Sequence, residues 1–114
     1  KMAIPGVPHY ITTKHGLNGM TKAVAVEVGE MGITCNAVCP GGILTDVMED
    51  QGPQAAAAIG MEFQDFLDMM AAPSAIKKFN DVEDVSLVTT LLASDAGAGI
   101  TGSLISIDGG TSPY

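Results

Sequence analysis

Basic side chains are scarce in this sequence, which has 5 Lys and Arg residues against 13 Asp and Glu residues and a net charge of −8. The basic residues form no cluster, and an acidic surface repels the phosphate backbone of nucleic acids, so we expect no nucleic-acid partner. No apolar run is long enough to span a bilayer, and the first residues lack the pattern of a signal peptide. These absences predict a cytoplasmic protein with no membrane partner.

Cysteine is also rare, with Cys35 and Cys39 as the two thiols of the chain. Both fall in an apolar stretch, 33–39, that we predict to be one strand buried on both faces. Residues four apart in a strand share a face but lie too far apart for an unstrained disulfide. No His or Cys lies beside them, so we expect no metal site. We interpret them as buried thiols in a reducing compartment.

The pattern of apolar residues alternates between helical and strand periods, which predicts an α/β fold. Steps of three and four residues predict a helix over about 9–30. The strand over 33–39 follows. A helix capped by Asp81, with Asp84 three residues on in a capping-box-like arrangement, ends near 94–95 and precedes a last strand over 104–107. At 114 residues, with 46% hydrophobic residues, the chain is one packed domain or part of one.

The segment 46–72 differs in character from the rest. We predict a helical turn or two over 46–50, a break at Gly52-Pro53 and a second helix over 54–70. Four of the seven methionines lie in this segment, and Met adapts readily to varied ligands. Two interpretations stay open: a mobile lid over the strand ends, and ordinary amphipathic packing.

Tyr10 and Lys14 have a spacing that suits acid/base chemistry. If 11–28 is one helix, residues four apart share a face, so these two side chains stack. A free tyrosine titrates near pH ~10, and a neighbouring ammonium group favours the phenolate. Such a pair makes a compact general acid/base. On its own the spacing favours two solvated surface side chains over a catalytic pair, because such pairs arise often by chance.

Three further residues predict close packing. Asn36 lies inside the strand over 33–39, where an unpaired amide is costly, so we expect it to bond a neighbouring loop. Gly16 and Gly19 each cost about 1 kcal/mol against Ala in a helix interior. We expect the backbone of a sheet or of a second helix to pack closely against them.

Pro40-Gly41-Gly42 ends the predicted strand abruptly. In open parallel sheets, ligands bind outside the carboxyl ends of the strands. The stretch 40–45 is therefore where we expect a bound ligand, with the glycines admitting it close to the backbone.

Taken together, these residues resemble the short-chain dehydrogenase/reductase family. The matching segments follow in order and at the family's spacings: Tyr10-x-x-Thr13-Lys14, Asn36-Ala37-Val38-x-Pro40-Gly41 with Thr45, Leu92-Ala93-Ser94-Asp95, Thr101-Gly102 and Asp108-Gly109-Gly110. The resemblance implies the C-terminal half of a Rossmann-type doubly wound parallel sheet, with a helical substrate lid at about 46–72.

The resemblance also implies an NAD- or NADP-dependent oxidoreductase that interconverts a secondary alcohol and a ketone. Tyr10 would be the acid/base and touch the cofactor, while Lys14 would favour its phenolate and bond the nicotinamide ribose. The residues that would line the nicotinamide are Pro40, Gly41, Ile43 and Thr45. The hydride moves between cofactor and substrate carbon, and the protein supplies position and a proton.

The family's glycine-rich pyrophosphate loop has no counterpart in this chain. We expect 1–114 to be the C-terminal part of a single Rossmann-like domain, without its N-terminal dinucleotide-binding half, and unable to bind cofactor or turn over alone. Two strands make a poor sheet, so we expect exposed apolar surface that the missing half or a complementing chain covers. The family usually forms homodimers or homotetramers through the helix of the Tyr, where Gly16 and Gly19 would suit close contact.

Substrate choice is implied by departures from the bacterial 3-hydroxybutyrate dehydrogenases, which this chain partly resembles. Val7 replaces a carboxylate-binding Lys, and Gly42 and Thr111 replace two Trp residues. These departures and the Met- and Phe-rich lid favour a fairly apolar alcohol or ketone. One alternative is a 3-oxoacyl carrier-protein reductase, against which the net charge of −8 speaks because the carrier is acidic. The other is a non-catalytic truncated fragment that acts only in oligomer assembly.

Overall fold

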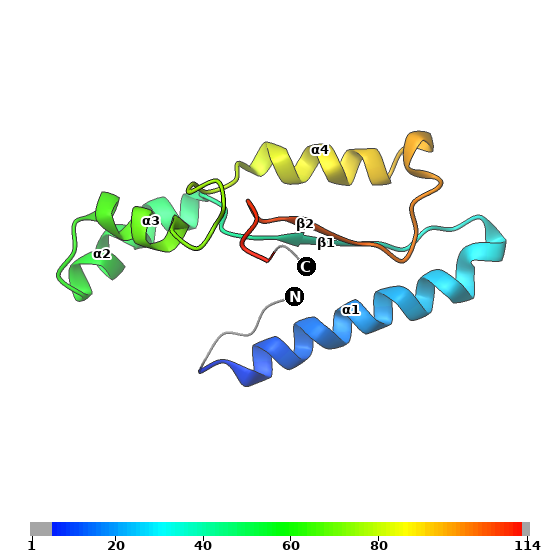
Figure 1. The fold of residues 1–114 in the computed structure, drawn as a ribbon, viewed down its shortest axis with the longest axis horizontal. Coiled ribbons are helices and arrows are strands. Elements are labelled where there is room, and N and C mark those ends of the chain that lie inside the picture. The colour runs from blue at the N-terminus through cyan, green and yellow to red at the C-terminus, as the bar shows by residue number, and fades with distance from the viewer. Residues whose placement is uncertain (1–5, 113–114) are drawn as a thin grey trace. The chain divides into compact units, whose positions relative to one another are not determined.

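The computed structural model describes residues 6–112 (Figure 1). Its elements are α1 (Pro8–Val28), a 3₁₀ turn (Gly29–Met31), β1 (Ala37–Pro40), α2 (Asp46–Ala58), α3 (Phe63–Ala71), α4 (Val82–Leu92), a second 3₁₀ turn (Asp95–Gly97) and β2 (Leu104–Ile107). The chain folds as two compact units, whose described residues are 6–39 with 87–105, and 40–86 with 106–112. The predicted alternation of helices and strands is confirmed.

β1 and β2 pair as a two-stranded sheet. The Ala37 amide donates to the Ser103 carbonyl at 2.9 Å, and the Gly41 amide donates to the Ile107 carbonyl at 3.0 Å. Both partners therefore advance in the same direction, and the strands are parallel. β2 has the bounds that the sequence predicts.

β1 begins later than the predicted strand over 33–39. The Gly102 amide donates to the Cys35 carbonyl at 2.7 Å, and the Cys35 amide donates to Thr101 Oγ1 at 3.0 Å. A side chain thus replaces one link of the regular ladder, which starts only at Ala37. The strand is also half-buried rather than buried on both faces, and Cys35 lies outside it as a free thiol.

The amide of Asn36 joins the same loop. Its Nδ2 donates to the Ile100 carbonyl at 2.7 Å, and its Oδ1 accepts from the Ser103 amide at 3.1 Å. The expectation that this side chain ties its segment to a neighbouring loop is confirmed.

α1 packs through the face that carries Thr21 and Ala25, which are 6% and 4% exposed. A Cβ on Gly102 would lie 3.5 Å from the Ala25 Cβ, so this face meets the loop before β2. Gly16 and Gly19 have no atom within 4 Å of a would-be Cβ among the described residues, so the predicted close packing within the chain is wrong. At 100° per residue they lie on the opposite side of the helix from the packed face.

The first unit has helices on both sides of its strands. Figure 1 shows α1 on one side of the strand pair and the C-terminal part of α4 on the other. This layering is that of a doubly wound sheet. At the start of α4, the Asp84 carboxylate accepts from the Asp81 amide at 2.9 Å, which confirms half of the predicted capping arrangement.

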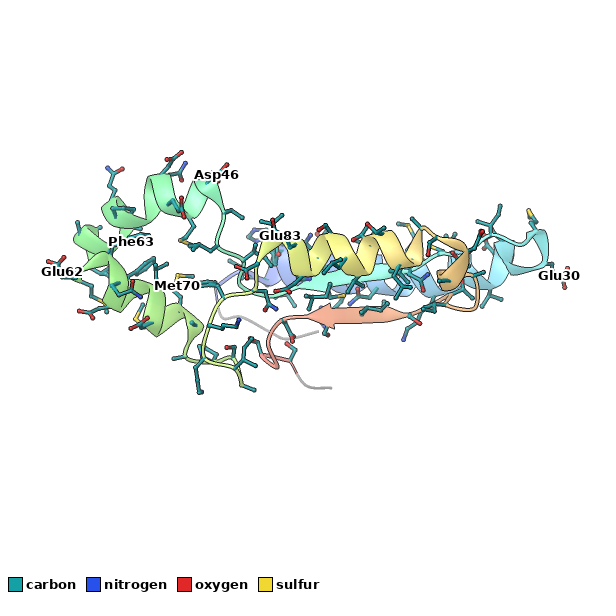
Figure 2. All side chains as sticks on the ribbon, turned by 90° about the horizontal axis from the view of Figure 1, so that it is seen from above. Glu30, Asp46, Glu62, Phe63, Met70 and Glu83 are labelled. Carbon is teal, nitrogen blue, oxygen red and sulfur yellow. The ribbon has the colours of Figure 1, made fainter. Side chains whose placement is uncertain are left out.

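α2 and α3 occupy the segment 46–72, but the break between them is not where the sequence predicts it. α2 continues through Gly52 and Pro53, so the predicted break there and the predicted helix over 54–70 are wrong. Gly52 is buried, and a Cβ on it would collide with the ring of Phe63, which lies between α2 and α3 (Figure 2). This tight packing offsets the loss of the Pro53 amide, which cannot donate within the helix.

Gly60 ends α2. It has φ +73°, its amide donates to the Ala57 carbonyl, and the Met61 amide donates to the Ala56 carbonyl, both at 3.0 Å. This pattern is the Schellman motif, in which a left-handed glycine satisfies the last carbonyls of a helix.

The interior of the described chain is small. Its buried apolar side chains are Ala25, Ala56 and Ala71, whereas Val26 is 83% exposed and Met31 and Leu87 are each 71% exposed. The expected exposure of apolar surface is confirmed. Within 6–112, no helix is long and apolar enough to cross a membrane.

Candidate active site

Tyr10 and Lys14 lie one turn apart near the start of α1. Lys14 Nζ lies 5.4 Å from the centroid of the Tyr10 ring, so the predicted stacking is confirmed. The ammonium group meets the face of the ring, where the π quadrupole attracts a cation. Tyr10 is 50% exposed, which leaves its hydroxyl accessible to a ligand.

Tyr10 and Lys14 lie on the same side of α1 as its buried residues. At 100° per residue, residues 10 and 14 fall on the same side of the helix as the buried Thr21 and Ala25. The buried part of this face fixes the rotation of the helix about its axis. It therefore also fixes the direction in which Tyr10 and Lys14 project.

The stretch 40–45 is held in the second unit by two neighbouring segments. The Gly42 carbonyl accepts from the Asn80 amide at 3.0 Å, and Ile43 forms a parallel bridge with Asn80. A Cβ on Gly41 would lie 2.6 Å from the Cα and the Cβ of Asp108. The absence of a side chain at Gly41 is therefore explained by its close contact with Asp108. The sequence did not indicate this contact.

Thr45 is the N-cap of α2. Its Oγ1 accepts from the Met48 amide at 3.4 Å, and its carbonyl accepts from the same amide at 2.8 Å. A hydroxyl has one donor and two acceptor positions, so the cap leaves the Thr45 O–H able to donate to a ligand. Pro40 is exposed and Ile43 is half-buried.

The predicted site residues fall into both units of the fold. Tyr10 and Lys14 lie in the first unit, and Pro40, Gly41, Ile43 and Thr45 lie in the second. Within 6–112, no group of three or more His, Cys, Asp or Glu side chains has a metal-binding arrangement.

Sequence reasoning assigned no role to Asp108, although Asp-Gly-Gly is a recognisable turn signal. Its carboxylate accepts from the amides of Gly110 and Ser112, each at 3.0 Å. The turn that results lies directly against Gly41.

Comparison with known sequences gives a consistent result. A family profile described as "Enoyl-(Acyl carrier protein) reductase" matches residues 1–112. The D-β-hydroxybutyrate dehydrogenase of Rhizobium meliloti (strain 1021) is 43% identical over 110 residues, which cover 96% of this chain and 43% of that protein. A 3-oxoacyl-[acyl-carrier-protein] reductase of Staphylococcus epidermidis is 35% identical over 109 residues, 96% of this chain and 40% of the reductase. The chain spans less than half the length of these curated relatives.

Comparison with solved structures gives the same fold. A short chain dehydrogenase family protein from Francisella tularensis subsp. tularensis SCHU S4 superposes with a TM-score of 0.90 at 26% identity, over 99% of this chain and 47% of that one. An actinorhodin polyketide ketoreductase with NADPH gives 0.85 at 26% identity, and a 4-hydroxyisoleucine dehydrogenase complexed with NADH gives 0.81 at 29%. Each of these two alignments covers 99% of this chain and 43% of the other. The predicted Rossmann-type α/β fold is confirmed.

Proposed function

The chain belongs to the short-chain dehydrogenase/reductase family, and we propose on that premise that it carries the catalytic pair of an NAD- or NADP-dependent oxidoreductase acting on a secondary alcohol and its ketone. The observation that carries this proposal is the position of Lys14 Nζ over the ring of the half-exposed Tyr10. The relatives are oxidoreductases by name, and two neighbours hold NADPH and NADH. The activity is proposed for the complete protein, in which residues 1–114 would form the C-terminal part of a single Rossmann-like domain.

In the proposed reaction, Tyr10 is the residue that transfers the proton. When a ketone is reduced, the Tyr10 hydroxyl donates its proton to the carbonyl oxygen, and in the reverse direction the phenolate accepts the proton of the alcohol. The nicotinamide, when bound, supplies or accepts the hydride at the substrate carbon. Lys14 would favour the phenolate by its charge and would donate to the nicotinamide ribose.

The stretch 40–45 would hold the nicotinamide. It follows the carboxyl end of β1, which is where parallel sheets bind ligands. The residues that we propose to line the ring are Pro40, Gly41, Ile43 and Thr45. The arrangement fits the group, because the Thr45 hydroxyl retains a donor that suits the oxygen of a carboxamide.

The composition of the proposed lid favours a fairly apolar, uncharged substrate. Its segment 46–72 contains six Asp and Glu residues and no Lys, among them Asp46 and Glu62 (Figure 2). Met69 and Met70 of α3 are 48% and 43% exposed and offer adaptable apolar surface. An anionic substrate would meet carboxylates of its own sign in this segment.

A 3-oxoacyl carrier-protein reductase is the second candidate. The 35% identity to the Staphylococcus epidermidis reductase favours it. The net charge of −8 opposes it, because the carrier protein is acidic. Turnover of a 3-oxoacyl thioester on the carrier, compared with the same acyl chain as a neutral ketone, decides between the two.

The catalytic assignment is tested by Tyr10→Phe in the complete protein. We expect turnover to fall by a factor of about 10² to 10⁴, since the proton donor is lost while the ring that carries it remains. The affinity for NADH or NADPH should stay close to that of the wild type, measured by fluorescence titration of both cofactors.

Lys14→Met and Lys22→Met form a matched pair for the same experiment. Both lysines are exposed on α1, but Lys22 does not contact Tyr10. Lys14→Met should lower turnover and weaken cofactor binding, whereas Lys22→Met should leave both unchanged. Full turnover in Tyr10→Phe would contradict the proposed function.

A further inference from the structure

The Asp108 side chain folds a tight turn after β2. Its Oδ1 accepts from the Gly110 amide and its Oδ2 from the Ser112 amide, each at 3.0 Å. Its carbonyl oxygen accepts from Thr111 Oγ1 at 2.7 Å. Both carboxylate oxygens are therefore occupied, and an Asn side chain, with one acceptor oxygen, cannot make both bonds.

One side of this turn touches the stretch 40–45. The Gly41 amide donates to the Ile107 carbonyl at 3.0 Å, immediately before the turn. A Cβ on Gly41 would lie 2.6 Å from both Cα and Cβ of Asp108, closer than real Cβ atoms approach other carbon atoms. The backbone at Gly41 therefore follows the position of Asp108 directly.

The other side of the turn touches the segment that leaves the lid. The Gly109 carbonyl accepts from the amides of Ala75 and Ile76 at 2.8 and 3.2 Å. A Cβ on Gly110 would lie 2.8 Å from the Ala75 Cβ. This segment, 73–80, connects the end of α3 to Asn80, whose amide bonds the Gly42 carbonyl.

We propose that Asp108 is a positioning residue that sets the stretch 40–45 and the lid exit 73–80 in one fixed geometry. The inference rests on the proposed function, which makes the first segment the nicotinamide wall and the second the base of the substrate lid. Its proposed role is structural, because each of its two carboxylate oxygens accepts a hydrogen bond from a backbone amide. A single carboxylate thereby aligns cofactor and substrate.

Asp108→Asn in the complete protein tests this inference. Loss of one charge-assisted hydrogen bond should raise the KM for cofactor and the KM for substrate, each by roughly tenfold, with a smaller change in kcat. Asp95→Asn is the matched control, because the Asp95 side chain is exposed and outside both segments. The control should keep the wild-type constants.

Two glycine variants separate the two sides of the turn. Gly41→Ala places a methyl group between the stretch 40–45 and Asp108, away from the segment 73–80, and should raise mainly the KM for cofactor. Gly110→Ala places a methyl group against Ala75 and should raise mainly the KM for substrate. Combined with Asp108→Asn, each should give a less than additive effect, because the two changes act on one contact.

Amide hydrogen exchange supplies a readout that needs no turnover. In Asp108→Asn, the amides of Ser112, Ala75 and Ile76 should exchange faster than in the wild type. Unchanged KM values despite faster exchange would overturn the positioning role, as would unchanged exchange. A wild type without NAD(P)-dependent turnover overturns the proposed function itself, which Tyr10→Phe tests separately.

Discussion

The side-chain amide of Asn36 forms hydrogen bonds to a single loop through both its nitrogen and its oxygen. The donor bonds the Ile100 carbonyl and the acceptor bonds the Ser103 amide, and the side chain is half-buried. A polar group that loses its partners in such a place keeps its desolvation cost without compensation. Asn36 is therefore one of the groups that hold the loop before β2, together with the bonds of Cys35 to Gly102 and Thr101.

Asn36→Ala should lower the free energy of unfolding by about 1–3 kcal/mol. Asn36→Asp retains an acceptor for Ser103 but sets a carboxylate oxygen against the Ile100 carbonyl, so we expect a loss at least as large. Urea denaturation of the complete protein measures both. Asn18→Ala on α1 is the matched control, since no hydrogen bond joins the Asn18 side chain to the part of the chain described; a loss equal to that of Asn36→Ala would contradict the argument.

The catalytic pair could be predicted from the sequence because its geometry is local. A spacing of four residues on a helix brings Tyr10 next to Lys14 whatever the rest of the chain does. The contact of Gly41 with Asp108 joins residues far apart in the sequence, so no local pattern indicates it. The capping role of Thr45 was likewise missed, although a Thr before an acidic first turn is a signal for it.

At the scale of elements, the segment 46–72 shows which local signals decide where a helix ends. Proline and glycine side by side predicted a break at Gly52-Pro53, yet the helix continues, and the Phe63 ring packs against Gly52. Sequence periodicity does not reveal that tertiary contact. The actual end at Gly60 needs a left-handed residue, which glycine adopts without strain.

Gly60→Ala should destabilise the fold at the end of α2 by about 1–2 kcal/mol. No atom of the described chain lies within 4 Å of the would-be Cβ, so the cost comes from the positive φ alone. Gly29→Ala is the matched control: its φ of −59° and ψ of −40° are helical and its surroundings are equally open. We expect that variant to be neutral or stabilising by about 0.4–1 kcal/mol. Thermal unfolding measures both, and equal losses would refute the role of Gly60.

At the scale of the whole molecule, the helices and strands of residues 6–112 leave much apolar surface uncovered. The buried apolar side chains of the described residues are three alanines, while Leu17 and Met20 of α1 are 45% and 57% exposed. Exposed patches of this kind mark surfaces that another segment or chain covers. This is the physical basis for proposing that residues 1–114 act as part of a larger domain.

The 114-residue chain alone should bind neither NADH nor NADPH. The groups proposed to contact the nicotinamide are present, but the sequence contains no glycine-rich loop for the pyrophosphate. It should also bind a dye that reports exposed apolar surface, and the complete protein should bind far less of it. Fluorescence titration checks both expectations, and saturable binding of either cofactor by the chain alone would contradict the first.

The close contacts of the two glycines after β1 limit which amino-acid substitutions this loop can accept in homologous proteins. Any side chain at Gly41 meets the backbone of Asp108, and any side chain at Gly42 meets the ring of Phe79. Thr45 is constrained as well, because its hydroxyl begins α2. Ile43 and Leu44 are the positions of this loop where we expect amino-acid substitutions to be tolerated. Related proteins that differ in the residues lining the nicotinamide are therefore expected to differ there.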